Sequence, residues 1–129
     1  MTSELGAAPR LRVLAADHFP DTADTMAALV RAWGHECDVA YDGDEALQAI
    51  EERWHDVILC DIAMPRTNGF DLAMNIRRRF GRLPLLIAVT GRVSLEDRLR
   101  AWQCGFDHFV TKPADPAQLR RLLENPVEG

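Results

Sequence analysis

Apolar segments of strand length alternate with helical segments five times along the chain. Residues 11–16, 57–60 and 85–89 are nearly continuous apolar runs, which are typical of strands covered on both faces. In residues 36–41, apolar and polar side chains alternate, as in a strand exposed to water on one side. A short run at 106–110 predicts the fifth strand. The alternating segment therefore belongs at an edge of the sheet, and the continuous runs belong inside it.

Between these runs, apolar residues recur at intervals of three and four, the period of an amphipathic helix. Gly34 stands where the first of these helices is expected to end, and Ser94 with Asp97 resembles a capping box. The predicted helices cover residues 21–33 and 42–54, continue after a loop with Pro65 and Gly69 as a helix through Ala73, Ile76 and Phe80, and begin again at 94 and 115.

Strands and helices that alternate at this spacing predict a parallel sheet with right-handed crossovers and helices on both faces. The chain has 129 residues and a mass of 14.5 kDa, the size of one domain. We expect this domain to cover residues 11–124, between an N-terminal tail at 1–10 and a C-terminal tail at 125–129. The sequence leaves open whether the chain stands alone or comes from a longer protein.

Composition excludes several classes of protein. With 47% hydrophobic residues, 27% charged residues and a net charge of -5, the chain is too apolar to be disordered and too acidic to favour direct nucleic-acid binding. No apolar run approaches the roughly 20 residues that span a bilayer, and the N-terminus lacks the pattern of a secretory signal. Three cysteines without Cys-x-x-Cys spacing favour reduced thiols in the cytoplasm over disulfides or a zinc site.

Polar residues end four of the predicted strands: Asp17 and His18 the first, Asp61 the third, Thr90 the fourth and Lys112 the fifth. The carboxyl ends of parallel strands meet at one edge of the sheet, where open α/β sheets bind their ligands. We therefore expect two carboxylates, an imidazole, a hydroxyl and an ammonium group to converge at this edge.

This set of side chains suits phosphoryl transfer. A carboxylate can attack phosphorus to form an acyl phosphate, and the reaction needs mainly charge stabilisation from a metal ion and a lysine. Asp61 is the candidate nucleophile, and Asp17 is a candidate metal ligand. Lys112 would neutralise one phosphoryl oxygen, and Thr90 would donate a hydrogen bond to another.

Four segments, RVLAADHFPD, DVILCDIAMPRTNGFDL, PLLIAVTG and FDHFVTKP, resemble the receiver domain of two-component response regulators. The resemblance extends from Leu11 to Leu123. It implies the flavodoxin-like (βα)5 fold, a three-layer sandwich whose parallel strands have the order 2-1-3-4-5. It also implies a cytoplasmic protein of two-component or phosphorelay signalling, which takes part only in its own phosphoryl transfer and dephosphorylation and is otherwise not an enzyme.

The resemblance also implies roles for individual residues. Asp61 would be the phosphoacceptor, with Lys112 as the family's lysine. Thr90 and Phe109 would be the switch residues that respond to phosphorylation. The peptide bond between Lys112 and Pro113 is expected to be cis.

A magnesium ion is the cofactor that the resemblance implies. Its ligands would be the carboxylates of Asp17 and Asp61 and the backbone carbonyl of Ala63, two residues after Asp61. The implied phosphoryl donor is a histidine kinase or a histidine phosphotransfer protein. The implied output is a protein that binds the face formed by the fourth helix, the fifth strand and the fifth helix, with no direct contact to nucleic acid or membrane.

One position departs from the family pattern, which has two adjacent acids after the first strand. Here Asp17 is followed by His18, and an imidazole is a poor ligand for Mg²⁺ but suits zinc, copper or nickel. In one alternative, the remaining oxygens still hold Mg²⁺ more weakly, with help from Asp21. In a second, a protonated His18 supplies positive charge itself. In a third, the chain is a pseudo-receiver that binds proteins without phosphorylation. The presence of Asp61, Thr90 and Lys112 favours phosphorylation.

Some residues near these motifs have a simpler interpretation. Phe19 is expected to be a core aromatic, and Trp33, Trp54 and Trp102, which lie at helical spacings, are expected to be packing residues. Cys60, next to Asp61, is expected to be a small buried side chain. The basic residues Arg77, Arg78, Arg79 and Arg82 are expected to form a solvated helix face.

Overall fold

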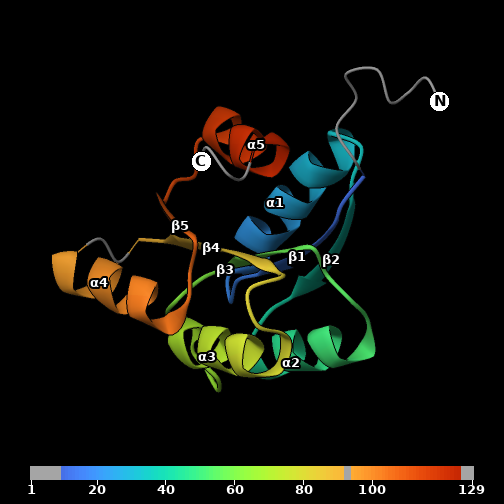
Figure 1. The fold of residues 1–129 in the computed structure, drawn as a ribbon. Coiled ribbons are helices and arrows are strands. Elements are labelled where there is room, and N and C mark those ends of the chain that lie inside the picture. The colour runs from blue at the N-terminus through green and yellow to red at the C-terminus, as the bar shows by residue number, and fades with distance from the viewer. Residues whose placement is uncertain (1–9, 92–93, 126–129) are drawn as a thin grey trace.

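The computed structural model describes residues 10–91 and 94–125 (Figure 1). The two predicted tails fall outside these ranges, apart from Arg10 and Asn125. The strands are β1 (Arg12–Ala16), β2 (Glu36–Ala40), β3 (Val57–Cys60), β4 (Leu85–Thr90) and β5 (His108–Thr111). The helices are α1 (Pro20–Ala32), α2 (Gly43–Glu52), α3 (Gly69–Phe80), α4 (Leu95–Cys104) and α5 (Pro116–Glu124).

The five strands form one parallel sheet in the order β2-β1-β3-β4-β5, which confirms the predicted flavodoxin-like topology. Figure 1 shows α1 and α5 on one side of the sheet and α2 and α3 on the other. The alternating strand β2 lies at an edge, and β1, β3 and β4 lie inside, as their apolar patterns predict. In the register, Ala16 at the end of β1 lies between Ala40 of β2 and Cys60 of β3.

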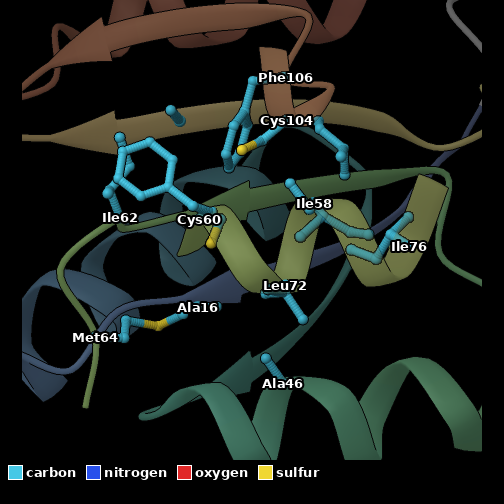
Figure 2. Packing of buried hydrophobic residues seen from close by; sticks show 14 of the residues in the cluster. Ala16, Ala46, Ile58, Cys60, Ile62, Met64, Leu72, Ile76, Cys104 and Phe106 are labelled. Carbon is cyan, nitrogen blue, oxygen red and sulfur yellow. The ribbon is translucent and has the colours of Figure 1, made fainter. Parts of the chain in front are cut away.

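Because successive strand residues point to opposite faces, each inner strand contributes to two apolar clusters. Val13 and Ala15 pack with α1 and α5, whereas Leu14 and Ala16 pack on the side of α2, α3 and α4. Figure 2 shows the second cluster, in which Ile58 and Cys60 of β3 lie near Leu72 and Ile76 of α3. The inner strands β1, β3 and β4 are therefore covered by apolar side chains on both faces, whereas the edge strand β2 keeps the partly exposed Asp38 in its middle.

Four of the five described helices begin at a polar residue, and α1 begins after Phe19 with Pro20 in its first turn. The side chains of Asp42, Asn68, Ser94 and Asp115 each accept a hydrogen bond from a backbone N–H in the first turn of α2, α3, α4 and α5. Gly34 follows α1 with a positive φ of 98°, as expected of a residue just past a helix end. No helix within the described ranges has the length and apolar character needed to cross a membrane.

Two predicted boundaries differ from the structure by two residues, and several others differ by one. The fifth strand begins at His108, because Phe106 turns into the core below α4. The helix α2 ends at Glu52, so Trp54 is not part of it. The Trp54 and Phe80 rings form an edge-to-face pair with their centroids 5.7 Å apart, and the Trp54 indole N–H donates to Asp56 at 3.0 Å. Trp102 on α4 is 53% exposed, so the prediction that it is a packing residue is wrong.

Arg77 contradicts the prediction of a uniformly solvated basic face. Its side chain is only 12% exposed and donates to the backbone carbonyls of Gly105 and Pro84 and to the carboxylate of Asp107. Desolvation lowers the pKa of Arg77, and the Asp107 carboxylate opposes this effect. The guanidinium therefore joins α3 to the loops before β4 and β5.

Candidate functional site

Asp17, Asp61 and Lys112 lie one residue past the ends of β1, β3 and β5. The Asp17 N–H donates to the carbonyl of Ala40 at 3.0 Å, and the Asp61 N–H donates to the carbonyl of Ala16 at 2.9 Å. On the far side of β4, the Lys112 N–H donates to the carbonyl of Thr90 at 2.9 Å. The sheet ladder itself thus fixes the positions from which these side chains project.

Each of the two carboxylates is anchored by one oxygen. The backbone N–H of Phe19 donates to Oδ1 of Asp17 at 3.0 Å, and the backbone N–H of Ala63 donates to Oδ1 of Asp61 at 3.2 Å. Such local bonds hold a carboxylate in one orientation. The second oxygen of each carboxylate is thereby directed toward the other groups of the site.

These second oxygens share one ammonium group. Nζ of Lys112 lies 2.6 Å from Oδ2 of Asp17 and 3.4 Å from Oδ2 of Asp61. The short contact with Asp17 is an ion pair without hydrogen-bond alignment, so Oδ2 of Asp17 has no hydrogen-bond partner. Nδ1 of His18 lies 3.5 Å from Oδ2 of Asp61 and also has no partner, although the atom itself is buried.

Burial makes the charge balance of this cluster important. Asp17 is completely buried and Asp61 is 3% exposed. Two buried carboxylates face a single lysine, which leaves one negative charge uncompensated when His18 is neutral. An uncompensated charge in a low-dielectric site is costly, so the site favours a further cation or the transfer of an electrophilic group.

Thr90 and Phe109 are placed on the strands beside this cluster. Thr90 ends β4, is almost completely buried and pairs in register with Thr111 of β5. Phe109 of β5 is half-buried against the apolar core on the α2–α4 side of the sheet. The guanidinium of Arg98 lies 4.9 Å from the centre of the Phe109 ring. This cation–π contact was not predicted, because only the packing of α4 on β5 brings the two residues together.

The loop after Asp61 approaches α3 so closely that only glycine fits at its first position. A Cβ atom on Gly69 would lie 2.7 Å from the Cα of Ile62 and 2.8 Å from the carbonyl oxygen of Asp61. The Gly69 N–H donates to the carbonyl of Ile62 at 2.8 Å. The start of α3 therefore supports the backbone of the candidate phosphoacceptor.

Phe19 contradicts the prediction of a core aromatic. Its ring is 55% exposed, lies 4.0 Å from the His18 ring between centroids and has Nζ of Lys112 5.4 Å from its centre. The reason is local: Phe19 occupies the N-cap position of α1, outside the helix face that packs on the sheet. A residue between a polar strand end and a helix-opening proline is the sequence signal for this placement.

The structure also tests the fit of a metal ion. One ligand atom from each of Asp17, His18 and Asp61 lies within 4.8 Å of the others. The carboxylate oxygens suit a divalent cation, but Nδ1 of His18 occupies a position where Mg²⁺ would require oxygen. Asp21 is exposed in the first turn of α1 and is not part of this group.

Cys60, directly before Asp61, does not join the cluster. Its side chain packs in the core on the α2–α4 side, and its Sγ lies 3.3 Å from the carbonyl oxygen of Asp61 (Figure 2). Burial, with the nearby charges of Asp61 and Asp17, raises the pKa of Cys60. The thiol is therefore protonated and serves as a small core side chain, as predicted. Cys37 and Cys104 are likewise free and buried.

The Lys112–Pro113 peptide bond is cis, as the resemblance implied. Comparison with family models matches residues 13–124 to the response regulator receiver domain. The chain belongs to this family. Receiver domains are in general signalling modules of two-component systems and not enzymes.

Individual relatives agree with this result. The chain is 38% identical over 108 residues to a gliding motility regulatory protein of Myxococcus xanthus, with 82% of this chain covered but only 14% of the relative. Among solved structures, a CheY-like response regulator receiver domain protein from Methanospirillum hungatei JF-1 superposes with a TM-score of 0.86 at 25% identity, covering 93% of this chain and 95% of the other.

A third comparison concerns a receiver domain with its metal. The receiver domain of a sensor histidine kinase from Pseudomonas aeruginosa PAO1, solved with a magnesium ion coordinated in the active-site cleft, has a TM-score of 0.82 at 26% identity. The two structures cover 94% of this chain and 100% of the other.

Proposed function

We propose that this receiver domain accepts a phosphoryl group on Asp61 from a phosphohistidine and thereby changes the binding of a downstream protein. The donor would be a histidine kinase or a histidine phosphotransfer protein in the cytoplasm. The observation that carries this proposal is that the two oxygens of the Asp61 carboxylate have different partners. One oxygen is anchored by the backbone of Ala63, and the other faces Lys112 within the buried cluster.

In the proposed reaction, the inward-facing oxygen of Asp61 attacks phosphorus in line with the bond to the donor imidazole. The new oxygen–phosphorus bond forms as the phosphorus–nitrogen bond breaks, and the imidazole nitrogen keeps the electron pair and takes up a proton. Lys112 neutralises charge on the phosphoryl oxygens. A divalent cation held by Asp17 and Asp61 would supply further positive charge when bound.

The donor would approach from a groove beside Lys112. This groove has a volume of about 530 Å³ and lies between α1 and the start of α5, with Met26, Leu29 and Pro116 among its lining residues. Its apolar walls and its opening next to the ammonium group suit a helix that carries a phosphohistidine.

Phosphorylation would be transmitted through Thr90 and Phe109. The Thr90 hydroxyl would move toward the phosphoryl group and donate a hydrogen bond to one of its oxygens. Phe109 would then move into the space that the Thr90 side chain leaves, away from Arg98. The exposed side chains of Leu95, Leu99 and Trp102 then offer an apolar stripe on α4 for the partner. The phosphoryl group would shift the population between two arrangements of the face formed by α4, β5 and α5.

The first test is modification by acetyl phosphate across a Mg²⁺ titration, followed by intact mass measurement. We expect the mass gain of one phosphoryl group in the wild type and none in Asp61→Asn. The matched control is Asp44→Asn, which changes an exposed acid in the first turn of α2 and should be modified normally. Circular dichroism would establish that both variants are folded.

A second measurement follows the switch. Beryllofluoride, which mimics the phosphoryl group, should shift the amide resonances of α4 and β5 in the wild type but not in Asp61→Asn. If Asp61 gains no phosphoryl group even at high Mg²⁺ and beryllofluoride leaves these resonances unchanged, the proposal is wrong and the chain acts without phosphorylation.

A further inference from the structure

The position that departs from the family pattern directs a nitrogen atom into the site. Nδ1 of His18 is buried, has no hydrogen-bond partner and lies 3.5 Å from Oδ2 of Asp61, although a third of the side chain is exposed. Oδ2 of Asp17 is also buried without a hydrogen-bond partner. A buried nitrogen without a hydrogen-bond partner, beside two buried carboxylates that share one lysine, indicates a missing ligand.

The geometry and the donor set agree on the kind of ligand. At metal–ligand distances of about 2.0–2.2 Å, two ligands of a tetrahedral ion lie roughly 3.4 Å apart. The separation between Nδ1 of His18 and Oδ2 of Asp61 is 3.5 Å. Imidazole nitrogen suits borderline first-row ions such as Zn²⁺ and Co²⁺, whereas Mg²⁺ keeps a shell of oxygen atoms.

We propose that His18, Asp17 and Asp61 form a mixed nitrogen–oxygen site that binds Zn²⁺ or Co²⁺ in preference to Mg²⁺. The site coincides with that of the proposed phosphorylation, so its role in supplying the cation for that reaction rests on the proposed function. The ability of the site to bind the metal is independent of the proposed function. The substitution of an acid by His18 therefore changes the metal preference of the site and leaves its carboxylates in use.

Two neighbouring groups set the limits of this site. The protonated thiol of Cys60 packs on the other side of β3 and contributes no soft ligand. The ammonium of Lys112 already lies 2.6 Å from Oδ2 of Asp17 and must compete with an incoming cation. Affinity is therefore expected to be moderate, and selectivity is the property to measure.

The test is a titration of the purified chain, freed of metal, with Zn²⁺, Co²⁺ and Mg²⁺ by isothermal calorimetry. His18→Asn, which removes the nitrogen ligand, should weaken Zn²⁺ binding by at least about tenfold, because a direct ligand contributes no less than the partners that orient the ligands. His18→Asp, which restores the family pattern, should weaken Zn²⁺ binding and strengthen Mg²⁺ binding by a similar factor.

Two spectroscopic readouts assign the binding to His18. Co²⁺ should give visible absorption bands whose intensity and position change in His18→Asp. Zn²⁺ should shift the imidazole resonances of His18, and the control variant His108→Gln should retain both effects. If wild type and His18→Asp have the same Zn²⁺ to Mg²⁺ ratio, or if Zn²⁺ shifts other histidines and not His18, the inference is wrong.

None of these measurements uses a phosphoryl donor, so the two proposals can fail separately. A His18-dependent Zn²⁺ site in a protein that acetyl phosphate never modifies would retain the metal site and overturn the phosphorylation. Modification of Asp61 with Mg²⁺ in a protein with no His18-dependent metal preference would overturn the metal site alone.

Discussion

The two rims of the sheet use their acidic side chains in different ways. At the amino ends of the strands, Asp56 accepts from the N–H of Arg12 at 2.8 Å and from the indole of Trp54, one bond on each oxygen. Asp107 accepts both of its hydrogen bonds on Oδ2, from the N–H of Leu86 at 2.9 Å and from Arg77 at 2.8 Å, and its Oδ1 lies 3.9 Å from the guanidinium of Arg82. These carboxylates are occupied by groups of the fold itself.

At the carboxyl ends, each acid keeps one oxygen for something else. Asp17 and Asp61 each use one oxygen to accept a backbone N–H, and their second oxygens share Lys112. We call the amino-end rim with Asp56 and Asp107 the closed rim, because its acids link elements of the fold. We call the carboxyl-end rim with Asp17 and Asp61 the open rim, because it holds negative charge that the fold does not neutralise. The hydrogen bonds alone thus distinguish acids that stabilise the fold from acids that are available for a ligand or a reaction. Substitutions at the two rims test this distinction.

The largest effect should come from the closed rim. Asp107→Ala removes the acceptor of the Leu86 N–H and leaves Arg77 without its carboxylate in a nearly buried position. We expect a loss of about 2–3 kcal/mol in the free energy of unfolding, measured by urea denaturation. Asp107→Asn, which keeps one acceptor oxygen, should lose less. Equal losses in the two variants would mean that the ion pair carries the whole effect.

A slightly smaller loss is expected where the open rim depends on backbone packing. In Gly69→Ala, the new methyl group meets the Cα of Ile62 and the carbonyl of Asp61, both backbone atoms that cannot move aside alone. Overpacking of this kind costs about 1–3 kcal/mol, and the acetyl phosphate reaction should slow as Asp61 shifts. Gly91→Ala, which meets no atom within 4 Å, is the control and should change neither property.

Loss of an acid at the open rim should not lower the free energy of unfolding as it does at the closed rim. Asp61→Asn removes one of two buried carboxylates that compete for Lys112, so stability should stay within about 1 kcal/mol of the wild type or rise. Thermal and urea unfolding would measure this change. A loss as large as that of Asp107→Ala would show that Asp61 is also a structural acid and would remove the distinction between the rims.

The smallest effect concerns the pH dependence of the closed rim. His35 is 6% exposed, and its Nδ1 accepts from the N–H of Leu11 at 3.0 Å, so the neutral form is part of the fold. Burial lowers the pKa of His35 below its ordinary value of 6.5, with partial opposition from Glu124.

The unfolded chain therefore binds a proton more readily than the folded chain. The contribution of His35 to stability is complete above about pH 6.5 and decreases as the pH falls toward the lower folded pKa. His35→Gln should make urea midpoints between pH 5 and 7 less dependent on pH than those of the wild type. An unchanged slope would mean that other groups control the acid sensitivity of this rim.

Most of the fold was predictable because its signals are local. The inner strands are recognisable since burial on both faces requires continuous apolar runs, and Asp42, Ser94 and Asp115 mark helix starts that the structure confirms. The error at Phe19 has a local cause, its N-cap position, but the errors at Trp54 and Arg77 arose where a neighbour distant in the sequence decides the outcome. Trp54 packs on Phe80 of α3, and Arg77 binds carbonyl groups of two loops.

The membership of the candidate site was predictable for a similar reason. Side chains that follow parallel strands must meet at one rim, so Asp17, Asp61 and Lys112 could be grouped from their positions alone. Their separate roles as phosphoacceptor, metal ligand and counter-charge stay predictions that the experiments above address. What the pattern could not provide is the orientation of each carboxylate, since that depends on which backbone N–H reaches which oxygen.

The sequence by itself thus determined the order of elements, the apolar inner strands of the sheet and the residues at its carboxyl-end rim, because these follow from periodicity and chain direction. Only the tertiary structure decided that Asp56 and Asp107 are closed by hydrogen bonds while Asp17 and Asp61 stay open, and that Nδ1 of His18 points at Asp61. The physical reason is that hydrogen bonds and charge interactions act over a few ångströms between groups far apart in the chain.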